Sequence, residues 1–189
     1  MSVTEIVLIV GVVAIAFYVI SIYNGLVKAR QMAEEAWSGI DVQLTRRADL
    51  IPSLVETVKG AAAHEKDTLA EVTKMRTRVQ SIDRSDVRGR AEAESMLSQA
   101  LGKLIAVAED YPELRSNENF LELQRSLETI EGEVQMSRRY FNGAVRDMNV
   151  KVESFPSNLV ANQFGFRQAE YFEMDDPADK AVPKVSFDT

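Results

Sequence analysis

Charged side chains interrupt an otherwise apolar helical pattern at Arg46–Lys59, which reads RRADLIPSLVETVK. Arg46, Arg47 and Asp49 stand close to Pro52 in this stretch. A charge on the apolar face of a helix can belong to a buried site that binds a ligand or reacts. It can equally fix the register of a structural helix, or reach solvent on a long side chain. Each interpretation requires different partners on the neighbouring helices.

A metal-dependent or acid–base centre is the next chemistry to consider, and His64 is the only histidine. A metallopeptidase needs H-E-x-x-H, but the motif that starts at His64-Glu65 ends on Thr68. A di-iron bundle needs two Glu-x-x-His motifs, and Ala61 stands where the glutamate would be. No phosphate-binding loop, dinucleotide turn or nucleophile elbow occurs in the sequence. We therefore predict a protein that is not an enzyme, without catalytic residue, cofactor or metal ion, and we interpret His64 as a surface or polar-cluster residue.

Composition narrows the function classes further. The 189 residues include no cysteine, which excludes disulfides, thiolate catalysis and zinc–thiolate sites. The net charge of −7 argues against a nucleic-acid partner, which would need a basic face. Acidic residues are concentrated after Glu170. We expect residues 167–189 to form an acidic, flexible C-terminal tail.

An uncharged stretch near the start is long enough to span a membrane. Ile6–Val27 contains 22 residues without a charge, and at ~1.5 Å per residue it extends roughly 33 Å, against a hydrocarbon core of about 30 Å. Tyr18 and Tyr23 lie toward one end, where amphipathic rings favour the lipid–water boundary. A cleaved signal peptide would need a basic start, which Met1–Glu5 lacks, and a core helix is rarely apolar on every face. We expect a retained transmembrane helix.

The flanking charges predict its orientation. Lys28 and Arg30 follow the span directly, and no basic side chain precedes it. By the positive-inside tendency, the N-terminus faces out and the remainder stays in the cytoplasm.

Apolar residues then recur at helical spacing. From Lys28 to Ile82 a main row repeats every seven residues, and a companion row runs beside it. This spacing is typical of a helix packed against other helices along one stripe. The main row is Trp37, Leu44, Ile51, Val58, Glu65, Val72 and Val79, and the companion row is Ile40, Arg47, Leu54, Ala61, Thr68, Met75 and Ile82.

Two further long helices are predicted. One covers Asp86–Glu109, with Ser85 as candidate N-cap. The other begins after Asn117, a second candidate cap, and is closed by Pro156. Its apolar row repeats every seven residues: Phe120, Leu127, Val134, Phe141, Met148 and Phe155. Asn158–Phe166 predicts a short further helix that ends at Gly165.

These elements predict an all-α protein. An N-terminal transmembrane helix in residues 1–27 continues into an antiparallel, coiled-coil-like helical bundle in residues 28–166, built from three long helices and one short C-terminal helix. The three long helices would measure roughly 80, 36 and 55 Å. Either the first one breaks near Gly60–His64, or part of its stripe overhangs the bundle and needs a second subunit.

The charges in these rows require partners. Pro52 should bend the first long helix without ending it, and Arg46 and Asp49 are spaced to pair across one turn. Arg47 and Glu65 occupy apolar positions roughly 27 Å apart along one helix, so they cannot pair with each other. We expect partners from the third long helix, where the candidates are Glu128, Glu131, Arg138 and Arg139.

Several blocks of the sequence resemble the LemA family of bacterial membrane-anchored proteins. The blocks are YNGLVKAR at Tyr23–Arg30, EEAWSGIDVQLTRRADLIPSLVETVKG at Glu34–Gly60, YPELRSNENFLELQ, ETIEGEV, SRRYFNGAVRDMNVKVESFPSNLVANQFGF and AEYFE. The chain departs from the family at two positions. Family members often have tyrosine where this chain has Phe141 and Met148, directly before Asn142 and Asn149. Hydrogen-bonded roles of those tyrosines are therefore not carried over.

The resemblance implies one membrane span, an outside N-terminus and a mostly helical cytoplasmic domain without established enzymatic activity. The family is linked to membrane organisation, including in magnetosome-forming bacteria, and its genes often accompany those of membrane metallopeptidases. The leading hypothesis is a scaffold that binds the lipid bilayer, forms homo-oligomers and organises the membrane. The alternative is an adaptor that presents its bundle or acidic tail to another membrane protein, such as a protease. An enzyme or sensor that uses Arg47 and Glu65 is the third class.

Overall fold

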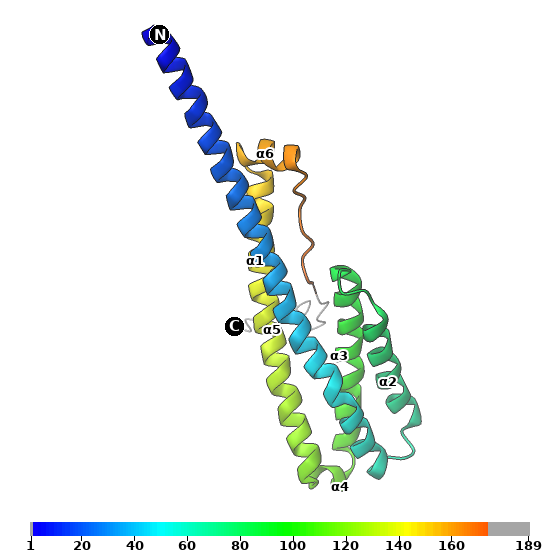
Figure 1. The fold of residues 1–189 in the computed structure, drawn as a ribbon. Helices are drawn as coiled ribbons and strands as arrows, with labels where there is room; N and C mark the ends of the chain where they lie inside the picture. Colours follow the sequence, from blue (N-terminus) through cyan, green and yellow to red (C-terminus); the bar gives the residue numbers. More distant parts are fainter. Residues whose placement is uncertain (1, 174–189) are drawn as a thin grey trace, which may run out of the picture. The chain divides into compact units, whose positions relative to one another are not determined.

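The computed structural model describes residues 2–173, and all regular structure in that part of the chain is α-helical (Figure 1). This confirms the predicted all-α class. The helices are α1 (Val3–Ala61), α2 (Lys66–Ser81), α3 (Val87–Glu109), α4 (Pro112–Arg115), α5 (Glu118–Glu153) and α6 (Ser157–Phe164). Of the predicted tail, residues 174–189 lie outside the described part.

The stretch predicted as one helix from Lys28 to Ile82 forms two helices. α1 ends at Ala61 and α2 begins at Lys66, so the helix breaks near Gly60–His64 and the overhanging stripe does not exist. The break follows from burial: the chain must reverse for Leu69, Val72 and Val79 of α2 to pack beside the apolar face of α1. Four helices, not three, are therefore long.

The helix ends follow local chemistry. Asp86 caps α3, and its carboxylate accepts a hydrogen bond of 2.8 Å from the Gly89 amide. The prediction of Ser85 as the cap was wrong, because the Ser85 amide and hydroxyl both donate to Asp83. The Asn117 side chain caps α5 through the Phe120 amide, as predicted. α6 ends as predicted at Gly165, which has a φ of 72°.

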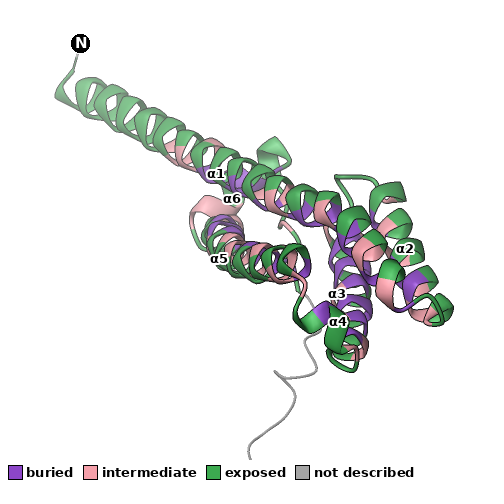
Figure 2. Ribbon diagram, turned by 90° about the horizontal axis from the view of Figure 1, so that it is seen from below, coloured by how far each residue is buried: buried purple, intermediate pink, exposed green. Residues whose placement is uncertain are grey.

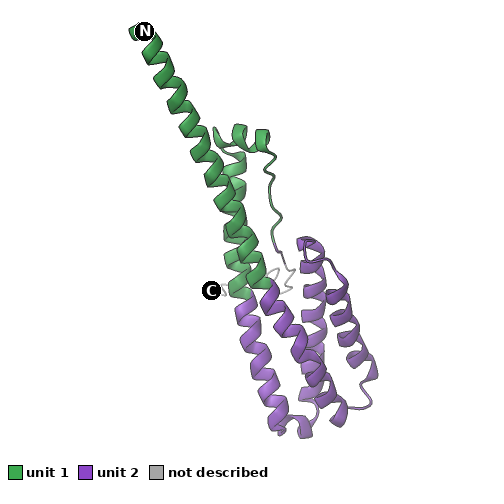
Figure 3. Cartoon of the chain, viewed as in Figure 1, with its two compact units in different colours: residues 1–40, 135–171 green, residues 41–134, 172–189 purple. Residues whose placement is uncertain are grey.

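The chain divides into two compact units (Figure 3). The unit made of residues 41–134 and 172–189, called unit 2, contains an up-and-down bundle of the C-terminal part of α1, α2, α3 and the N-terminal part of α5, with α4 at one end (Figure 1). These helices share one apolar core. Its buried members include Ile51, Leu54, Val58, Leu69, Val72, Leu97, Leu101, Leu104, Leu114, Phe120 and Leu127.

Residues 1–40 and 135–171 form the other unit, called unit 1. Here α1 and α5 run antiparallel: the ring of Trp37 lies 5.3 Å from that of Phe141, and the Lys151 Nζ donates to the Gly25 carbonyl at 3.1 Å. α6 packs on α1 through a smaller apolar cluster, whose buried members are Leu26, Val160, Ala161 and Phe166.

The start of α1 is exposed along its length (Figure 2). Among the described residues, α1 is the one helix whose length and composition allow it to cross a membrane. Its most apolar stretch of 18 residues is not covered by any other described part of the protein. A soluble core helix would have that stretch covered. The predicted span at Ile6–Val27 therefore lies in a helix that can cross a bilayer.

Gly165 and Gly102 give a matched pair of glycine variants. Gly165→Ala should lower the free energy of unfolding by about 1–2 kcal/mol, because an L side chain is strained at its positive φ. Gly102→Ala should raise it by about 0.5–1 kcal/mol, since Gly102 lies inside α3 and an added Cβ meets no atom within 4 Å. Urea unfolding of the detergent-solubilised protein, followed by circular dichroism, measures both. Shifts of the same sign would contradict the different backbone conformations of the two glycines.

Candidate functional site

Arg47 of α1 is completely buried in unit 2, although it carries a permanent charge. Its guanidinium forms an ion pair with the buried Glu94 of α3 and another, of 2.6 Å, with Glu131 of α5. It also donates to the Ser98 hydroxyl at 2.9 Å. The Arg47 Nε has no acceptor among the described residues. One side chain thus joins three helices.

The ion pairs continue beyond Glu94. The second carboxylate oxygen of Glu94 accepts from Arg90, one turn earlier on α3, at 3.2 Å. Arg90 reaches Asp41 of α1 at 3.3 Å, and Asp41 also pairs with Arg84 at 3.4 Å. The signs alternate along this series, which we call the charge chain: Glu131, Arg47, Glu94, Arg90, Asp41 and Arg84.

Burial and attraction act in opposite directions on the Arg47 charge. Desolvation alone lowers the pKa of the guanidinium, because a charged group loses its water. The nearby carboxylates of Glu94 and Glu131 outweigh this and raise the pKa above its ordinary value. Arg47 therefore stays charged at every pH at which the protein is folded. It cannot give up or take up a proton in a reaction.

Glu131 was among the predicted partners of Arg47, but Glu94 and Arg90 were not predicted as site residues. The signal was present in the sequence. Arg90 and Glu94 continue the apolar row of α3 toward its N-terminus, with the same alternating spacing of four and three residues that relates Leu97, Leu101 and Leu104. A charged pair in that row indicates buried polar partners, as Arg47 does in its own row.

Arg46 and Asp49 do not pair across their turn, so that prediction was wrong. Arg46 lies at the surface and its guanidinium binds Glu133 of α5 at 2.8 Å. Asp49 is exposed, and none of the described basic side chains lies within ion-pair distance of it. The same Arg46 nitrogen also donates to the Gln43 side chain of its own helix at 3.0 Å.

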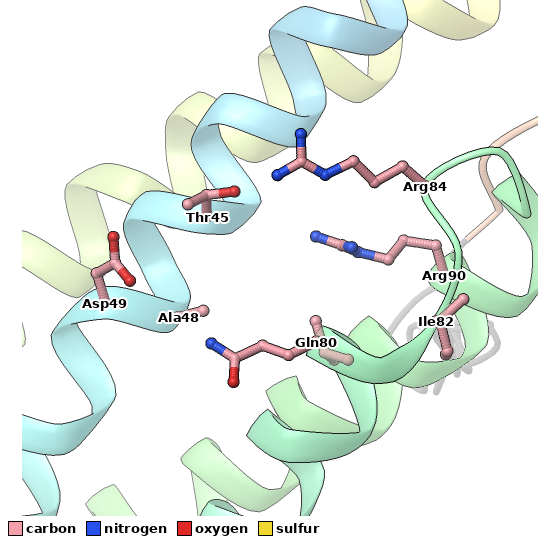
Figure 4. Close-up of a pocket in the computed structure, with 8 residues that line it drawn as sticks. Thr45, Ala48, Asp49, Gln80, Ile82, Arg84 and Arg90 are labelled. Carbon is pink, nitrogen blue, oxygen red and sulfur yellow. The ribbon is translucent and has the colours of Figure 1, made fainter.

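Asp49 borders a pocket of about 270 Å³ between α1 and the residues that link α2 to α3 (Figure 4). Figure 4 shows the guanidinium groups of Arg84 and Arg90 on the opposite wall from Thr45 and Asp49. The wall is completed by Ala48, Val79, Gln80 and Ile82. The pocket offers hydrogen-bond donors and one acidic group, but no nucleophile with a base beside it.

Pro52 does not end α1, as predicted, and its effect on the helix is compensated by α2. Proline has no amide hydrogen, so the carbonyl of Ala48, four residues earlier, loses its helical donor. The Arg76 Nε donates to this carbonyl at 2.9 Å from α2. The arginine replaces the bond that the proline removes.

Glu65 does not bind the third long helix, contrary to the prediction. It stands at the start of α2, where the expected continuous helix is broken, and its carboxylate accepts from the Tyr111 hydroxyl at 3.1 Å. This hydrogen bond is the main cause that raises the pKa of Tyr111 above its ordinary value. His64 is exposed in the turn just before Glu65.

The remaining candidate residues belong to unit 1. Trp37 packs against Phe141, and Asn142 is half-buried. Asn149 is buried and forms two hydrogen bonds with the backbone of Ala169. Its side-chain oxygen accepts from the Ala169 amide at 2.8 Å, and its side-chain nitrogen donates to the Ala169 carbonyl at 3.0 Å. Arg138 is half-buried and Arg139 is exposed; within residues 2–173 neither forms an ion pair. These residues thus belong to a different unit from the charge chain.

Residues 2–173 contain no group of three or more His, Cys, Asp or Glu side chains that could hold a metal ion. The charge chain is the most densely polar place in the described interior, and its groups bind one another. This geometry indicates a network of ion pairs that holds α1, α3 and α5 together.

Sequence comparison places this architecture among known proteins. The sequence model of the LemA family matches residues 36–187. The chain belongs to the LemA family. The match covers α2, α3, α4, α5 and α6, most of the part of α1 after the span, and every member of the charge chain.

The chain is similar to LemA and magnetosome proteins of several bacteria. Magnetosome protein MamQ 2 of Paramagnetospirillum magneticum is 24% identical over 198 residues, which cover 92% of this chain and 73% of that protein. Protein LemA of Metamycoplasma hominis is 24% identical over 166 residues, covering 88% and 73%. Magnetosome protein MamQ of Magnetospirillum gryphiswaldense is 23% identical over 184 residues, covering 85% and 68%.

Removing the charge of Arg47 should destabilise this LemA-family chain severely. Arg47→Met should lower the free energy of unfolding by about 3–5 kcal/mol, because Glu94 remains buried without its partner. Arg46→Met is the matched control and should cost about 0–1 kcal/mol, since its ion pair is exposed. Adding Glu94→Leu to Arg47→Met should recover much of the loss. Loss of function without loss of stability in Arg47→Met would show a chemical role instead.

The Pro52 compensation predicts an interaction between two distant substitutions. Arg76→Met should cost on the order of 1 kcal/mol in the wild type, because the Ala48 carbonyl loses its donor. It should cost less in a Pro52→Ala background, where the amide of residue 52 can bind that carbonyl again. A double-mutant cycle in urea unfolding measures the difference. Equal costs in both backgrounds would refute the compensation.

Proposed function

We propose that this LemA-family protein is a non-enzymatic scaffold, anchored by the N-terminal part of α1 in the bacterial inner membrane, that self-associates and organises the bilayer. The observation that carries the proposal is the uncovered apolar stretch of α1. A surface of that size is not stable in water, so it calls for lipid or protein around it. A stretch of 22 uncharged residues fits lipid.

The flanking charges support an orientation. Lys28 and Arg30 are both exposed directly after the span, and cationic side chains are retained on the cytoplasmic side. The bundle would then lie in the cytoplasm and the short N-terminus outside. Two of the related proteins are named for the magnetosome, and the proposed role in membrane organisation is of the same general kind.

Residues 2–173 show no evident reaction centre, and this supports the non-enzymatic part of the proposal. The buried charges neutralise one another across helices, and the Ser98 hydroxyl accepts a hydrogen bond from Arg47, which stays protonated and cannot act as a base toward it. A catalytic group would need a pKa matched to its reaction and access to a substrate. Arg47 has neither, since it is buried and permanently charged.

An apolar strip on α5 supports self-association. Met136 and Tyr140 lie one turn apart and are 58% and 57% exposed, and these two side chains make up the strip. The strip belongs to unit 1, the unit that contains the span. Side-by-side contact of anchored copies would bury it.

Substitution of the two strip residues tests the proposed self-association. The full-length protein in detergent should have the mass of an oligomer in light scattering. The double variant Met136→Ser with Tyr140→Ser should raise the dissociation constant of that oligomer at least about tenfold, because two side chains that contribute ~1.5–3 kcal/mol each leave the interface. Met96→Ser on α3 is the control, because Met96 is also exposed but lies outside the strip. A wild-type protein that stays monomeric at all concentrations would contradict self-association.

The adaptor remains the alternative, and the pocket beside Asp49 favours it. This carboxylate has no basic partner in the described chain and stands at the edge of a cavity, so a basic side chain of another membrane protein could pair with it. Cross-linking in cells should then capture a different protein that is lost on Asp49→Asn. Ladders of self-adducts that Asp49→Asn does not change would favour the scaffold.

A further inference from the structure

α6 lies against the end of the predicted membrane span. Its buried residues Val160 and Ala161 share a cluster with Leu26, and Val19, Ile22 and Val27 border the same cluster. The ring of Tyr23 lies 4.9 Å from that of Phe164. Figure 1 shows α6 across the C-terminal end of α5, on the side from which the N-terminal part of α1 extends.

These contacts fix the depth of α6 relative to the bilayer. Val19 and Val27 are separated by about 12 Å along α1, so the stretch between them forms roughly the last two and a half turns of the span. Any helix that packs on these residues must share their depth. If Ile6–Val27 crosses the hydrocarbon, α6 lies where the acyl chains meet the headgroups.

The outer surface of α6 suits that location. Phe155 is 80% exposed and Leu159 is 61% exposed, which makes them the two most exposed large apolar side chains after the span in the described residues. Phe164 is 56% exposed, although its ring packs on Tyr23 on the side of α6 that faces α1. Large apolar side chains gathered at this exposure mark a surface that binds something.

The charge pattern also fits an interface with lipid. Ser154–Phe166 contains no charged residue, in a chain that is 27% charged. Basic groups border it: the Arg30 guanidinium lies 5.3 Å above the Phe166 ring, and Arg167 is exposed directly after it. Glu153 directly precedes it, and the Glu153 carboxylate accepts a hydrogen bond from the Gln168 side chain. An uncharged apolar segment with cations at one border fits the surface of a membrane that contains anionic lipids.

We propose that α6, together with Phe155, is a second membrane contact, which lies in the interfacial region of the same bilayer that α1 crosses. Phe155, Leu159 and Phe164 insert among the lipid headgroups and upper acyl chains. This rests on the proposed anchoring by α1. The contact attaches unit 1 at two points, so that α1 cannot rotate freely about its axis in the membrane.

The test exploits the absence of cysteine from the chain. Leu159→Cys in the full-length protein carries a single nitroxide spin label, and the protein is reconstituted in vesicles of phosphatidylethanolamine and phosphatidylglycerol. Electron paramagnetic resonance then compares collisions with oxygen, which is concentrated in lipid, and with a nickel chelate that stays in water. Leu159 is exposed, so the label does not disturb the core.

Two control positions bracket the result. Phe17→Cys lies within the span and is 68% exposed, and Val42→Cys lies on α1 well beyond it and is 55% exposed. A label at Leu159 should collide with oxygen more than with nickel, to a degree between those at the two controls. A label at Phe17 that behaves as in water would refute the anchoring itself.

Other outcomes would overturn the second contact while leaving the anchoring intact. A Leu159 label that behaves like the Val42 label would place α6 in water. A label shielded from both reagents would mean that protein covers α6, and spin–spin broadening would identify that protein as a second copy. Circular dichroism of each labelled variant verifies that the helices are unchanged.

Discussion

The fold of unit 2 depends on the neutralisation of one buried cation. Arg47 cannot lose its charge, so α1, α3 and α5 have to present their carboxylates and hydroxyl at its position. An apolar seam alone would tolerate a slip of one heptad, because it repeats every seven residues. A slip that moves Arg47 away from Glu94 and Glu131 leaves an unpaired charge in the interior, and on this hypothesis the cost of that charge disfavours the alternative registers that the repeat would otherwise allow.

Periodicity predicted most of the architecture, because helical amphipathicity is a local signal. The bounds of α3, the Asn117 cap and the stop at Gly165 all depend on residues within one or two turns. The break between α1 and α2 was predicted only as one of two possibilities, because four alanine and glycine residues precede His64 and permit a helix or a turn equally. What decides it is the burial of α2 against α1, which is a tertiary effect.

The polar partners were harder to predict for a similar reason. Arg47 is an anomaly in its own row, and Glu131 was among its candidate partners, but Glu94 was missed because the apolar row that marks α3 begins only at Leu97. Arg76 could not be predicted at all, since the carbonyl that it binds becomes available through a proline 24 positions earlier on another helix. Local sequence shows that a partner is needed, and the fold determines which residue supplies it.

The distances along the chain within the charge network have a consequence for biosynthesis. Arg47 and Glu94 are 47 residues apart, and Arg47 and Glu131 are 84 apart. A growing polypeptide thus contains the first counterion well before the second, and both are present only once the last long helix has been translated. Contacts between positions this far apart in the sequence form slowly, so we expect the pairing of Arg47 with Glu131 to be among the later steps of assembly.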